Sequence, residues 1–453
     1  MQKVTKLTKI INSTVYMDYL PNAIFAVILI LGIGYFVKNV KKLVRNIRLG
    51  QDVDVSDNKS QRLKNMAMVA LGQSKMVRRP VAGILHVIVY VGFIVINLEV
   101  LEIIIDGIFG THRIGLHVLP QSLYGSLIGI FEILAILVLV SVIVFWVRRN
   151  IIKLARFWKS EMTAWPKNDG NFILYFEMVL MALFLIMNAA DTSFQQLNTG
   201  NIISQYIAPW FNGLSASSLH IIERTTWWLH IIGILVFLNY LYFSKHLHII
   251  LAFPNTYYAK LQPKGQLNNL EAVTKEVKMM LDPNADPFAA PEEGTEEEMP
   301  AKFGASDVQD LTWVQLLNAY TCTECGRCTS ECPANLTGKK LSPRKIMMDT
   351  RDRLEEVGKN IDTNNGEFKD DGKQLLDDYI TREEIWACTT CNACVEACPV
   401  GIDPLSIILE MRRYLVMEQS AAPVELNNMM SNIENNGAPW PYNQMDRLNW
   451  KNE

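Results

Sequence analysis

Eight cysteines form two copies of one motif in the second half of the chain. Each copy has the spacing Cys-x-x-Cys-x-x-Cys-x-x-x-Cys-Pro, and no cysteine lies outside the two copies. This spacing supplies the four thiolates that a [4Fe–4S] cube requires, and the fourth cysteine, ahead of proline, usually binds the other cluster of a pair. The motif therefore predicts two [4Fe–4S] clusters. The predicted ligands are Cys322, Cys325, Cys328, Cys332, Cys388, Cys391, Cys394 and Cys398.

Two other kinds of cysteine-rich site fit this motif less well. A disulfide framework is typical of secreted proteins, whereas these cysteines follow an apolar segment and lie on its basic-loop side. Zinc sites more often use paired Cys-x-x-Cys or mixed Cys/His spacings. The sequence therefore favours iron–sulfur clusters over both alternatives.

The seven histidines all lie in the first 250 residues, where the chain is apolar. An imidazole inside a membrane is costly unless it binds something, so it indicates a functional site. His230 and His248 are eighteen residues apart. In one continuous helix this is five turns, so both would project from one face, about 27 Å apart, with His246 about 160° away. Two imidazoles stacked in this way are what a dihaem cytochrome b requires.

Each haem would also need a ligand from another helix. His86 lies early in the second apolar segment, at a depth that could meet His248, so we predict this pair as one bis-imidazole site. His230 would need a partner near the outer face, which His112, His117 or His220 could supply. Both one haem and two haems remain open at this point.

The 453-residue chain divides into an apolar half and a polar half. Only 20% of its residues are charged, and the net charge of −3 does not suggest a nucleic-acid partner. A membrane core of about 30 Å takes about 20 helical residues. Five apolar stretches meet this length, near 18–38, 81–105, 121–147, 171–190 and 225–247.

The basic residues predict how these helices are oriented. Residues 38–80 carry eleven Lys or Arg and residues 148–167 carry six, whereas the alternate loops carry only Arg113 and Arg224. The positive-inside rule therefore places the N-terminus outside and the second half of the chain in the cytoplasm, although three lysines near the N-terminus oppose this. The first apolar segment lacks a signal-peptide cleavage site. We predict a multi-pass protein of the bacterial inner (cytoplasmic) membrane.

Residues 18–252 resemble the cytochrome b subunit of respiratory nitrate reductase and the membrane subunit of heterodisulfide reductases. The resemblance rests on five spans, on His86, and on the segments Trp227–His230 and Lys245–Ile249. In the nitrate reductase subunit the fifth helix carries two haem-ligating histidines eighteen apart, which implies His230 and His248 here. The second helix there carries two ligands ten apart, and only His86 has a counterpart. The resemblance implies a five-span haem b domain over residues 1–252, with one or two haems.

Five carboxylates in or beside the spans are candidates for proton transfer or quinone binding, since charged groups at membrane depth often mark proton paths. Some of them could instead simply reach the outer interface. They are Glu99, Glu102, Glu132, Glu177 and Asp191.

The polar half begins with a predicted flexible acidic linker over residues 253–302, which contains six prolines and the acidic run Glu292–Glu298. Residues 303–418 resemble the α-helical two-cluster ferredoxins of heterodisulfide reductase and anaerobic glycerol-3-phosphate dehydrogenase. The resemblance rests on Leu341-Ser342-Pro343, on Trp386–Asn392 and on the 55 residues between the two motifs. It implies crossed ligation. One cube would take Cys322, Cys325, Cys328 and Cys398, and the other Cys388, Cys391, Cys394 and Cys332.

The predicted fold class is therefore all-α, with a five-helix transmembrane cytochrome b-like bundle followed by a cytoplasmic α-helical ferredoxin domain. Residues 419–453 are predicted to be a partner-binding tail that presents Trp440 and Trp450. In fused relatives a similar segment leads into Cys-Cys-Gly-rich catalytic modules. We therefore expect the catalytic module to be a separate polypeptide of this type, or an electron-transfer flavoprotein.

The chain contains no nucleotide-binding fingerprint and no spare cysteine nucleophile, so its predicted chemistry is electron relay rather than catalysis on a soluble substrate. We predict a membrane electron-transfer subunit of a quinone-linked oxidoreductase. It would pass electrons between the membrane quinone pool (menaquinone or ubiquinone), haem b and two [4Fe–4S] clusters. The alternatives are an iron–sulfur sensor or scaffold with a membrane anchor, and a subunit of an ion-translocating redox complex.

Overall fold

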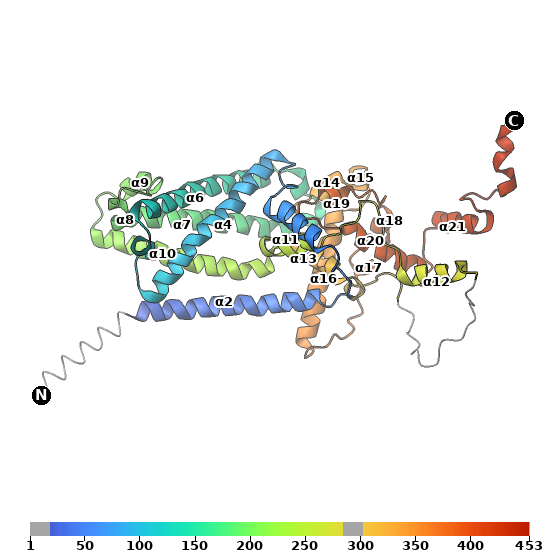
Figure 1. Cartoon of the computed structure of the whole chain (residues 1–453), viewed down its shortest axis with the longest axis horizontal. Coiled ribbons are helices and arrows are strands. Elements are labelled where there is room, and N and C mark those ends of the chain that lie inside the picture. Colours follow the sequence, from blue (N-terminus) through green and yellow to red (C-terminus); the bar gives the residue numbers. More distant parts are fainter. Residues whose placement is uncertain (1–18, 284–301, 453) are drawn as a thin grey trace.

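The computed structural model describes residues 19–283 and 302–452. The described residues are mainly helical and contain no β-strand, only two isolated bridges (Figure 1). Five long apolar helices are followed by a C-terminal domain of shorter helices. This confirms the predicted all-α fold class and its five membrane helices.

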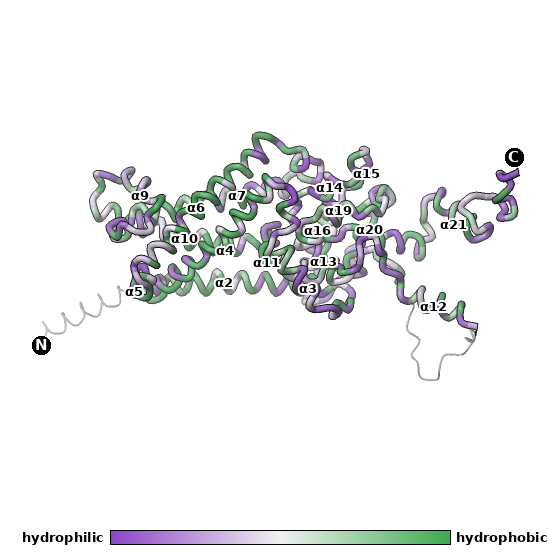
Figure 2. Tube along the Cα trace, turned by 45° about the horizontal axis from the view of Figure 1, so that its top comes forward, coloured by the Kyte–Doolittle hydropathy of each residue, from purple (hydrophilic) through white to green (hydrophobic). Residues whose placement is uncertain are grey.

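The five membrane helices pack as one bundle. α7 lies between α6 and α10, α4 packs on α6, and α2 packs on α4 and α10. The hydrophobic stretches in Figure 2 gather on these helices. The helices are α2 (Leu20–Ile47), α4 (Pro80–Phe109), α6 (Gln121–Asn150), α7 (Trp165–Ala190) and α10 (Ala216–Tyr240), the last extended as a span to Phe243.

Much of the apolar surface of these helices faces outward. In α2, Ile30 and Leu31 are 69% and 66% exposed. A soluble monomer rarely exposes a contiguous apolar patch of this kind, whereas a bilayer covers it. Inside the bundle, small residues let the helices approach closely, as at Gly92, where an added Cβ would collide with Val138.

His230 and His248 do not lie on one helix, and the prediction of a continuous fifth helix is wrong on this point. α10 ends at Tyr240, Ser244 is extended (φ −114°, ψ 146°), and α11 (His248–Tyr257) begins at His248 itself. Asp169 stabilises the break, because it accepts hydrogen bonds from the Tyr240 hydroxyl (2.6 Å) and the Lys245 backbone N–H (3.1 Å). The eighteen-residue spacing is therefore not five turns along one face.

The C-terminal domain is built from two copies of a loop followed by a short helix. A residue in the left-handed region precedes each helix: Gly326 (φ 70°) before α14 (Arg327–Glu331) and Asn392 (φ 59°) before α19 (Ala393–Ala397). α14 packs on α19, so the two cysteine motifs lie side by side. The domain also contains α13 (Trp313–Thr321), α15 (Pro333–Leu336), α16 (Pro343–Thr363), α17 (Leu375–Asp378), α18 (Arg382–Trp386) and α20 (Pro404–Arg413).

The long segment between the motifs forms part of the domain core. Arg353 on α16 is fully buried and donates to Asp307 (2.7 Å) and Asp371 (2.6 Å). A buried charge needs such partners, so this cluster fixes the segment against the start of the domain.

The membrane bundle and the C-terminal domain meet in a packed junction. Asn46, near the end of α2, donates to the Tyr320 hydroxyl (2.9 Å), and Lys42 pairs with Asp362 (2.6 Å). The Gln51 backbone pairs with that of Leu311. The basic loops 38–80 and 148–167 therefore lie at the end of the bundle that carries this domain.

The predicted linker over 253–302 differs from the structure where the chain is described. Residues 253–257 belong to α11, which packs on α13, and Asn255 donates to the Val400 carbonyl (2.8 Å). Residues 271–281 form helix α12 (Glu271–Leu281). The acidic run 292–298 lies outside the described residues.

Short helices complete the fold. In the predicted tail, α21 (Val424–Asn436) is followed by a 3-10 segment (Gln444–Lys451), and Trp440 and Trp450 are 52% and 69% exposed. Neither tryptophan is buried against the rest of the chain. The remaining α-helices are α3 (Lys59–Met66), α5 (Gly115–Val118), α8 (Thr192–Gln196) and α9 (Ser204–Ile207).

Candidate metal centres and the cavity beside them

The eight cysteines form two predicted groups, each with three cysteines of one motif and the fourth of the other. Besides burial, nearby charge at Cys398 raises the pKa of Cys322 and of Cys328, and nearby charge at Cys332 raises the pKa of Cys388 and of Cys394. Charge at Cys394 also raises the pKa of Cys328, so the two groups are neighbours. The crossed ligation that the resemblance implies stays a prediction. Cys391 is the exposed member, and the other seven are buried or half-buried.

The surroundings of the thiols suit a cluster of several metal ions. Burial raises the pKa of Cys322 and of Cys394 to about 12, so their thiolates need nearby positive charge. Backbone N–H groups donate to sulfur, from Thr390 to Cys388 (3.4 Å) and from Ile402 to Cys398 (3.3 Å). Among the described residues, no three His, Cys, Asp or Glu side chains converge on a single ion. Four thiols in each predicted group, with backbone N–H groups that donate to sulfur, are the donor set that an iron–sulfur cluster uses.

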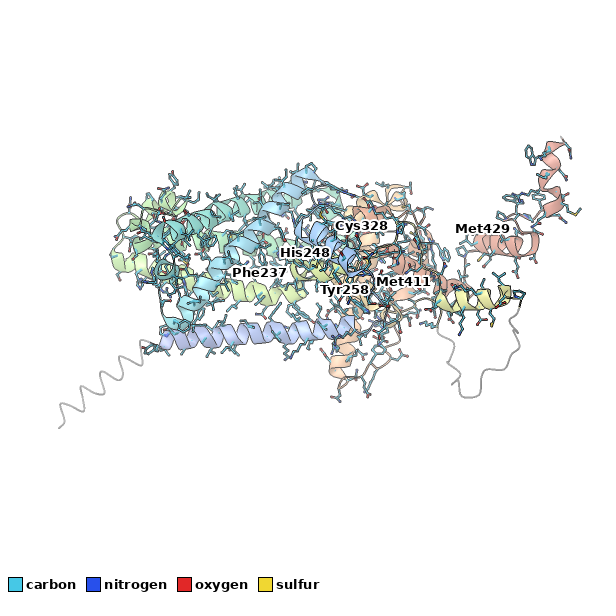
Figure 3. The ribbon with its side chains drawn as sticks, viewed as in Figure 1. Phe237, His248, Tyr258, Cys328, Met411 and Met429 are labelled. Atoms are coloured by element: carbon cyan, nitrogen blue, oxygen red, sulfur yellow. The ribbon has the colours of Figure 1, made fainter. Side chains whose placement is uncertain are left out.

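A cavity of about 380 Å³ lies at the junction between the bundle and the C-terminal domain, and we call it the inner cavity. His86 from α4 and His248 from the start of α11 line its membrane side. Cys325, Arg327 and Val400 line its other side. Figure 3 labels His248 and Cys328 in this part of the molecule. One space is thus bounded both by three imidazoles, those of His86, His246 and His248, and by a member of the first cysteine group.

Two of these imidazoles are spaced for one metal between them. The ring centres of His86 and His248 are 6.3 Å apart. A metal bonded on opposite sides to two imidazoles, at about 2.0 Å from each nitrogen, would separate the ring centres by roughly 6 Å. The structure thus brings together the pair that the sequence predicted.

Hydrogen bonding also prepares the two rings. His248 Nδ1 lies 3.1 Å from the Lys245 carbonyl, which can only accept, so Nδ1 carries the proton and Nε2 is left for a metal. His86 Nδ1 is buried and has no partner among the described residues. A buried nitrogen without a partner, in a residue that lines a cavity, indicates that a further group belongs there. His246 also lines this cavity and lies 3.6 Å from Glu177.

A buried ion pair links the segment that carries His248 to the first cysteine loop. The sequence did not indicate this ion pair. The Lys245 ammonium pairs with the carboxylate of Glu324, which lies between Cys322 and Cys325 and also accepts from Arg351 (2.7 Å). Lys245 is therefore bonded both to the His248 ring and to the loop of the first group. No spacing rule relates residues 79 positions apart, so only the folded chain reveals this contact.

His230 lies apart from the other histidines. It is 2% exposed in the middle of α10, it packs on Phe184 with ring centres 6.1 Å apart, and its Nδ1 has no described partner. It lines neither the inner cavity nor the outer one described next. Its role as a haem ligand stays a prediction.

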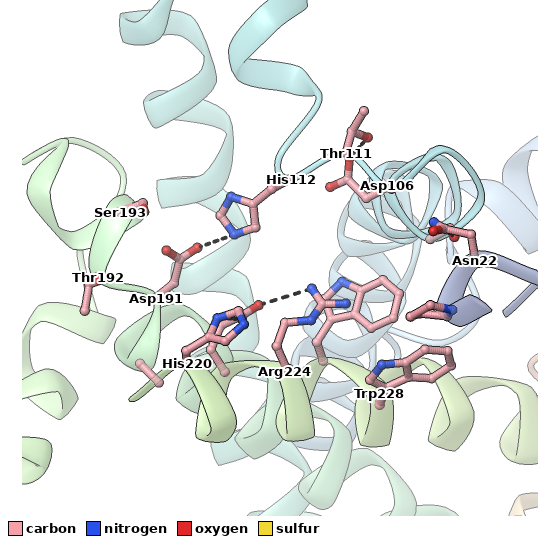
Figure 4. A pocket seen from close by; sticks show the side chains of 16 residues that line it. Asn22, Asp106, Thr111, His112, Asp191, Thr192, Ser193, His220, Arg224 and Trp228 are labelled. Atoms are coloured by element: carbon pink, nitrogen blue, oxygen red, sulfur yellow. Dashed lines mark hydrogen bonds and ion pairs between the residues drawn. The ribbon is translucent and has the colours of Figure 1, made fainter. Parts of the chain in front are cut away.

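A second, larger cavity of about 620 Å³ lies at the opposite end of the bundle, and we call it the outer cavity (Figure 4). His112 and His220 line it, but each is paired with a carboxylate. His112 lies 3.3 Å from Asp191 and His220 lies 3.6 Å from Glu223. His117, the third candidate partner for His230, does not line it.

The Glu132 carboxylate is enclosed by the protein, both of its oxygens accept hydrogen bonds, and it lines neither the inner nor the outer cavity. It is fully buried and accepts hydrogen bonds from Asn188 (3.0 Å) and from the backbone N–H groups of Ile203 (2.7 Å) and Ser204 (3.0 Å). Its carboxylate therefore holds the start of α9 against α6 and α7. Of the other candidates, Glu99 is buried with one oxygen unpaired among the described residues, and Glu102 accepts from Tyr124 (3.0 Å).

Residues 321–402, which contain both cysteine motifs, match the family model of the 4Fe-4S dicluster domain. The chain is 28% identical over 460 residues to the probable iron-sulfur-binding oxidoreductase FadF of Bacillus subtilis, covering 95% of this chain and 60% of that protein. It is 26% identical over 433 residues to an EtfAB:quinone oxidoreductase of Syntrophomonas wolfei, covering 89% of this chain and 55% of that protein. The chain thus spans less than two thirds of either relative.

The C-terminal domain has further relatives. Over 108 residues, 24% of this chain and 52% of the relative, it is 35% identical to a subunit of the ferredoxin/F420H2-dependent CoB-CoM heterodisulfide reductase of Methanosarcina acetivorans. No solved structure matches the chain. The relatives are iron–sulfur oxidoreductases and heterodisulfide reductase subunits, which supports electron transfer through a two-cluster 4Fe–4S domain.

Proposed function

We propose that this chain is a membrane electron-transfer unit of a quinone-linked oxidoreductase. It moves electrons between menaquinone or ubiquinone, one haem b and two [4Fe–4S] clusters, to or from a partner protein. The inner cavity carries this proposal, because His86, His248 and Cys325 line one space. A metal held by the two histidines would lie next to the first cysteine group, and electron transfer requires such proximity.

In this proposal the chain holds and orients its redox centres. Cys322, Cys325, Cys328 and Cys398 would hold the first cluster, and Cys388, Cys391, Cys394 and Cys332 would hold the second. His86 and His248 would hold the haem. When bound, these groups supply one-electron exchange at potentials that ligands, burial and hydrogen bonds set. The Lys245 carbonyl fixes the His248 ring, and the N–H groups of Thr390 and Ile402 stabilise negative charge on sulfur.

A partner protein would exchange electrons with the cluster of the second cysteine group. Cys391, a member of this group, is the one exposed cysteine of the eight. The Syntrophomonas relative is named for the electron-transfer flavoprotein EtfAB, and other relatives are heterodisulfide reductase subunits. We therefore propose an electron-transfer flavoprotein or a heterodisulfide reductase-like module as the partner, with the exposed tail as part of the contact.

The location also belongs to the proposal. The basic loops lie at the end of the bundle that carries the cysteine domain, and such loops favour the cytoplasmic side. The cysteine domain would then be cytoplasmic and the outer cavity would face the other side of a bacterial inner membrane.

Absorption spectra and metal analysis of the purified protein test this proposal. We expect a b-type α band in the reduced-minus-oxidised spectrum and about eight irons beyond haem iron, four for each cube. A protein without the α band would contradict the haem, and zinc in place of iron would contradict the clusters.

A further inference from the structure

A groove lined by four arginines lies beside the inner cavity. Its volume is about 490 Å³, and it lies between the start of α4 and the loop that follows α6. Its cationic lining is Arg78, Arg79, Arg148 and Arg156.

Only two of these four charges have acidic partners among the described residues. Arg78 pairs with Glu396, and Arg79 pairs with Glu331 (2.6 Å). Within the described parts of the chain, the Arg148 side chain makes no hydrogen bond or ion pair, and the buried Nε of Arg156 has no acceptor. The groove therefore holds two arginines that have no carboxylate partner among the described residues.

The surroundings of the groove are apolar and outward-facing. Val81 and Ile84 on α4 are 57% and 59% exposed, and Ile151 and Ile152 at the end of α6 are 63% and 58% exposed. These residues lie at the ends of two membrane helices, where acyl chains begin. An occupant of the groove would thus meet guanidinium groups at one end and a hydrocarbon-facing surface beside them.

We propose that this groove binds the phosphate headgroup of an anionic phospholipid. Guanidinium groups donate paired hydrogen bonds to phosphate oxygens, and basic pockets between membrane helices bind anionic headgroups. The apolar residues beside the groove accommodate the acyl chains. The phosphate of a bound lipid would supply the negatively charged partner that Arg148 and Arg156 lack. It would lie next to the Arg78–Glu396 and Arg79–Glu331 ion pairs, which join the bundle to the C-terminal domain.

Native mass spectrometry of the full-length protein, exchanged into phosphatidylglycerol or phosphatidylcholine, tests this site. The test variant is Arg148→Gln with Arg156→Gln. Because a basic residue near the surface contributes about 1 kcal/mol to anionic-lipid binding, we expect roughly 25-fold weaker retention of phosphatidylglycerol in the double variant. Phosphatidylcholine should be retained weakly by both proteins.

The matched control is Lys153→Gln with Lys167→Gln. It removes the same charge nearby, from two lysines that lie over the Trp158 ring and do not line the groove. We expect the control to retain phosphatidylglycerol within about twofold of the unaltered protein. If both double variants lost phosphatidylglycerol equally, the lipid would be held only by the general positive charge of this surface, and the proposed site would be wrong. Undiminished retention in the arginine variant would overturn it as well.

Two further arms separate the lipid from other anions that the same arginines could bind. Arg148 and Arg156 also line the inner cavity, so the carboxylates of the proposed haem are one alternative. Lipid retention should be the same in His86→Ala with His248→Ala. Retention that rises only in this variant would assign the arginines to the haem and overturn the lipid site.

Inorganic phosphate should not displace the lipid, and full displacement would indicate that the groove binds a soluble anion instead. This result does not depend on whether the redox proposal holds.

Discussion

The inner and outer cavities both contain histidines from the membrane bundle, but they present them differently. At the inner cavity the rings of His86 and His248 are 6.3 Å apart, and in the described structure neither ring is paired with a carboxylate. At the outer cavity His112 and His220 each lie beside one, Asp191 or Glu223. A carboxylate occupies one nitrogen of a ring and leaves the other open, so it does not by itself exclude a metal. His246, which also lines the inner cavity, lies beside Glu177 as well. The inner cavity therefore differs in having two rings at the separation that one metal requires, and this separation, rather than histidine content, marks the candidate ligands.

Removing an inner histidine should have the largest effect. We expect His248→Ala to abolish the b-type absorption band, because one imidazole cannot replace the opposed pair. His112→Ala, the matched change at the outer cavity, should leave the band unchanged. The reduced-minus-oxidised spectrum of each purified variant measures this. If the band were lost in both variants, or in His112→Ala alone, the assignment of the haem ligands to the inner cavity would be contradicted.

The crossed grouping of cysteines should determine which cluster each variant loses. Cys398→Ser should lose the same cluster as Cys325→Ser, and Cys332→Ser the same cluster as Cys391→Ser. Iron content should fall from about eight to about four beyond haem iron in each case. Electron paramagnetic resonance of the reduced variants identifies the missing cluster. If Cys398→Ser matched Cys391→Ser, each motif would hold its own cluster and the grouping would be wrong.

Breaking the buried pair at the junction should weaken the first cluster site. Lys245→Met leaves the Glu324 carboxylate buried with Arg351 as its remaining cation, and breaking a buried ion pair costs about 3 kcal/mol. We expect thermal loss of cluster absorption at a lower temperature. The Lys245 backbone carbonyl that orients His248 is unchanged by this substitution, so the haem spectrum should stay the same.

The control for this pair is Lys302→Met at the more exposed Lys302–Asp310 pair, where the loss should be under about 1 kcal/mol. Lys245→Met combined with Glu324→Gln should recover part of the stability, since it removes the buried Glu324 carboxylate that the single variant leaves with one cation fewer. A single variant as stable as the control would show that the pair does not hold the junction.

The smallest effect should come from Glu132 at the outer end. Glu132→Gln removes one charged acceptor of the two N–H groups at α9, which should cost about 1–2 kcal/mol locally. Faster hydrogen exchange over residues 203–207, with an unchanged haem spectrum, is the expected result. A change in the haem spectrum with unchanged exchange would instead indicate a redox or proton role for this carboxylate.

The parts of the fold that could be predicted are those with local signals. Length and hydropathy predicted the five spans, since a helix must satisfy its own backbone in lipid. The cysteine spacing predicted a two-cluster domain, and the match over residues 321–402 agrees with it. His86 and His248 could be paired because helix depth follows from position along each span.

The parts that could not be predicted depend on contacts between distant segments. The break at Ser244 depends on Asp169, a residue of α7, so periodicity along the fifth span alone extended the helix too far. The Lys245–Glu324 pair likewise exists only after the domain docks on the bundle. At the outer cavity, His112 and Asp191 come from separate segments of the chain, and no spacing indicates that they meet.

Flash photoreduction of the purified protein tests most directly whether electrons cross the inner cavity. A soluble flavin would reduce the exposed second cluster first, and absorption would follow the clusters and the haem together. The account predicts that the clusters reoxidise and the haem is reduced with one shared rate constant, and that this phase disappears in Cys398→Ser. A haem that is reduced independently of the clusters, or at an unchanged rate in that variant, would contradict the account.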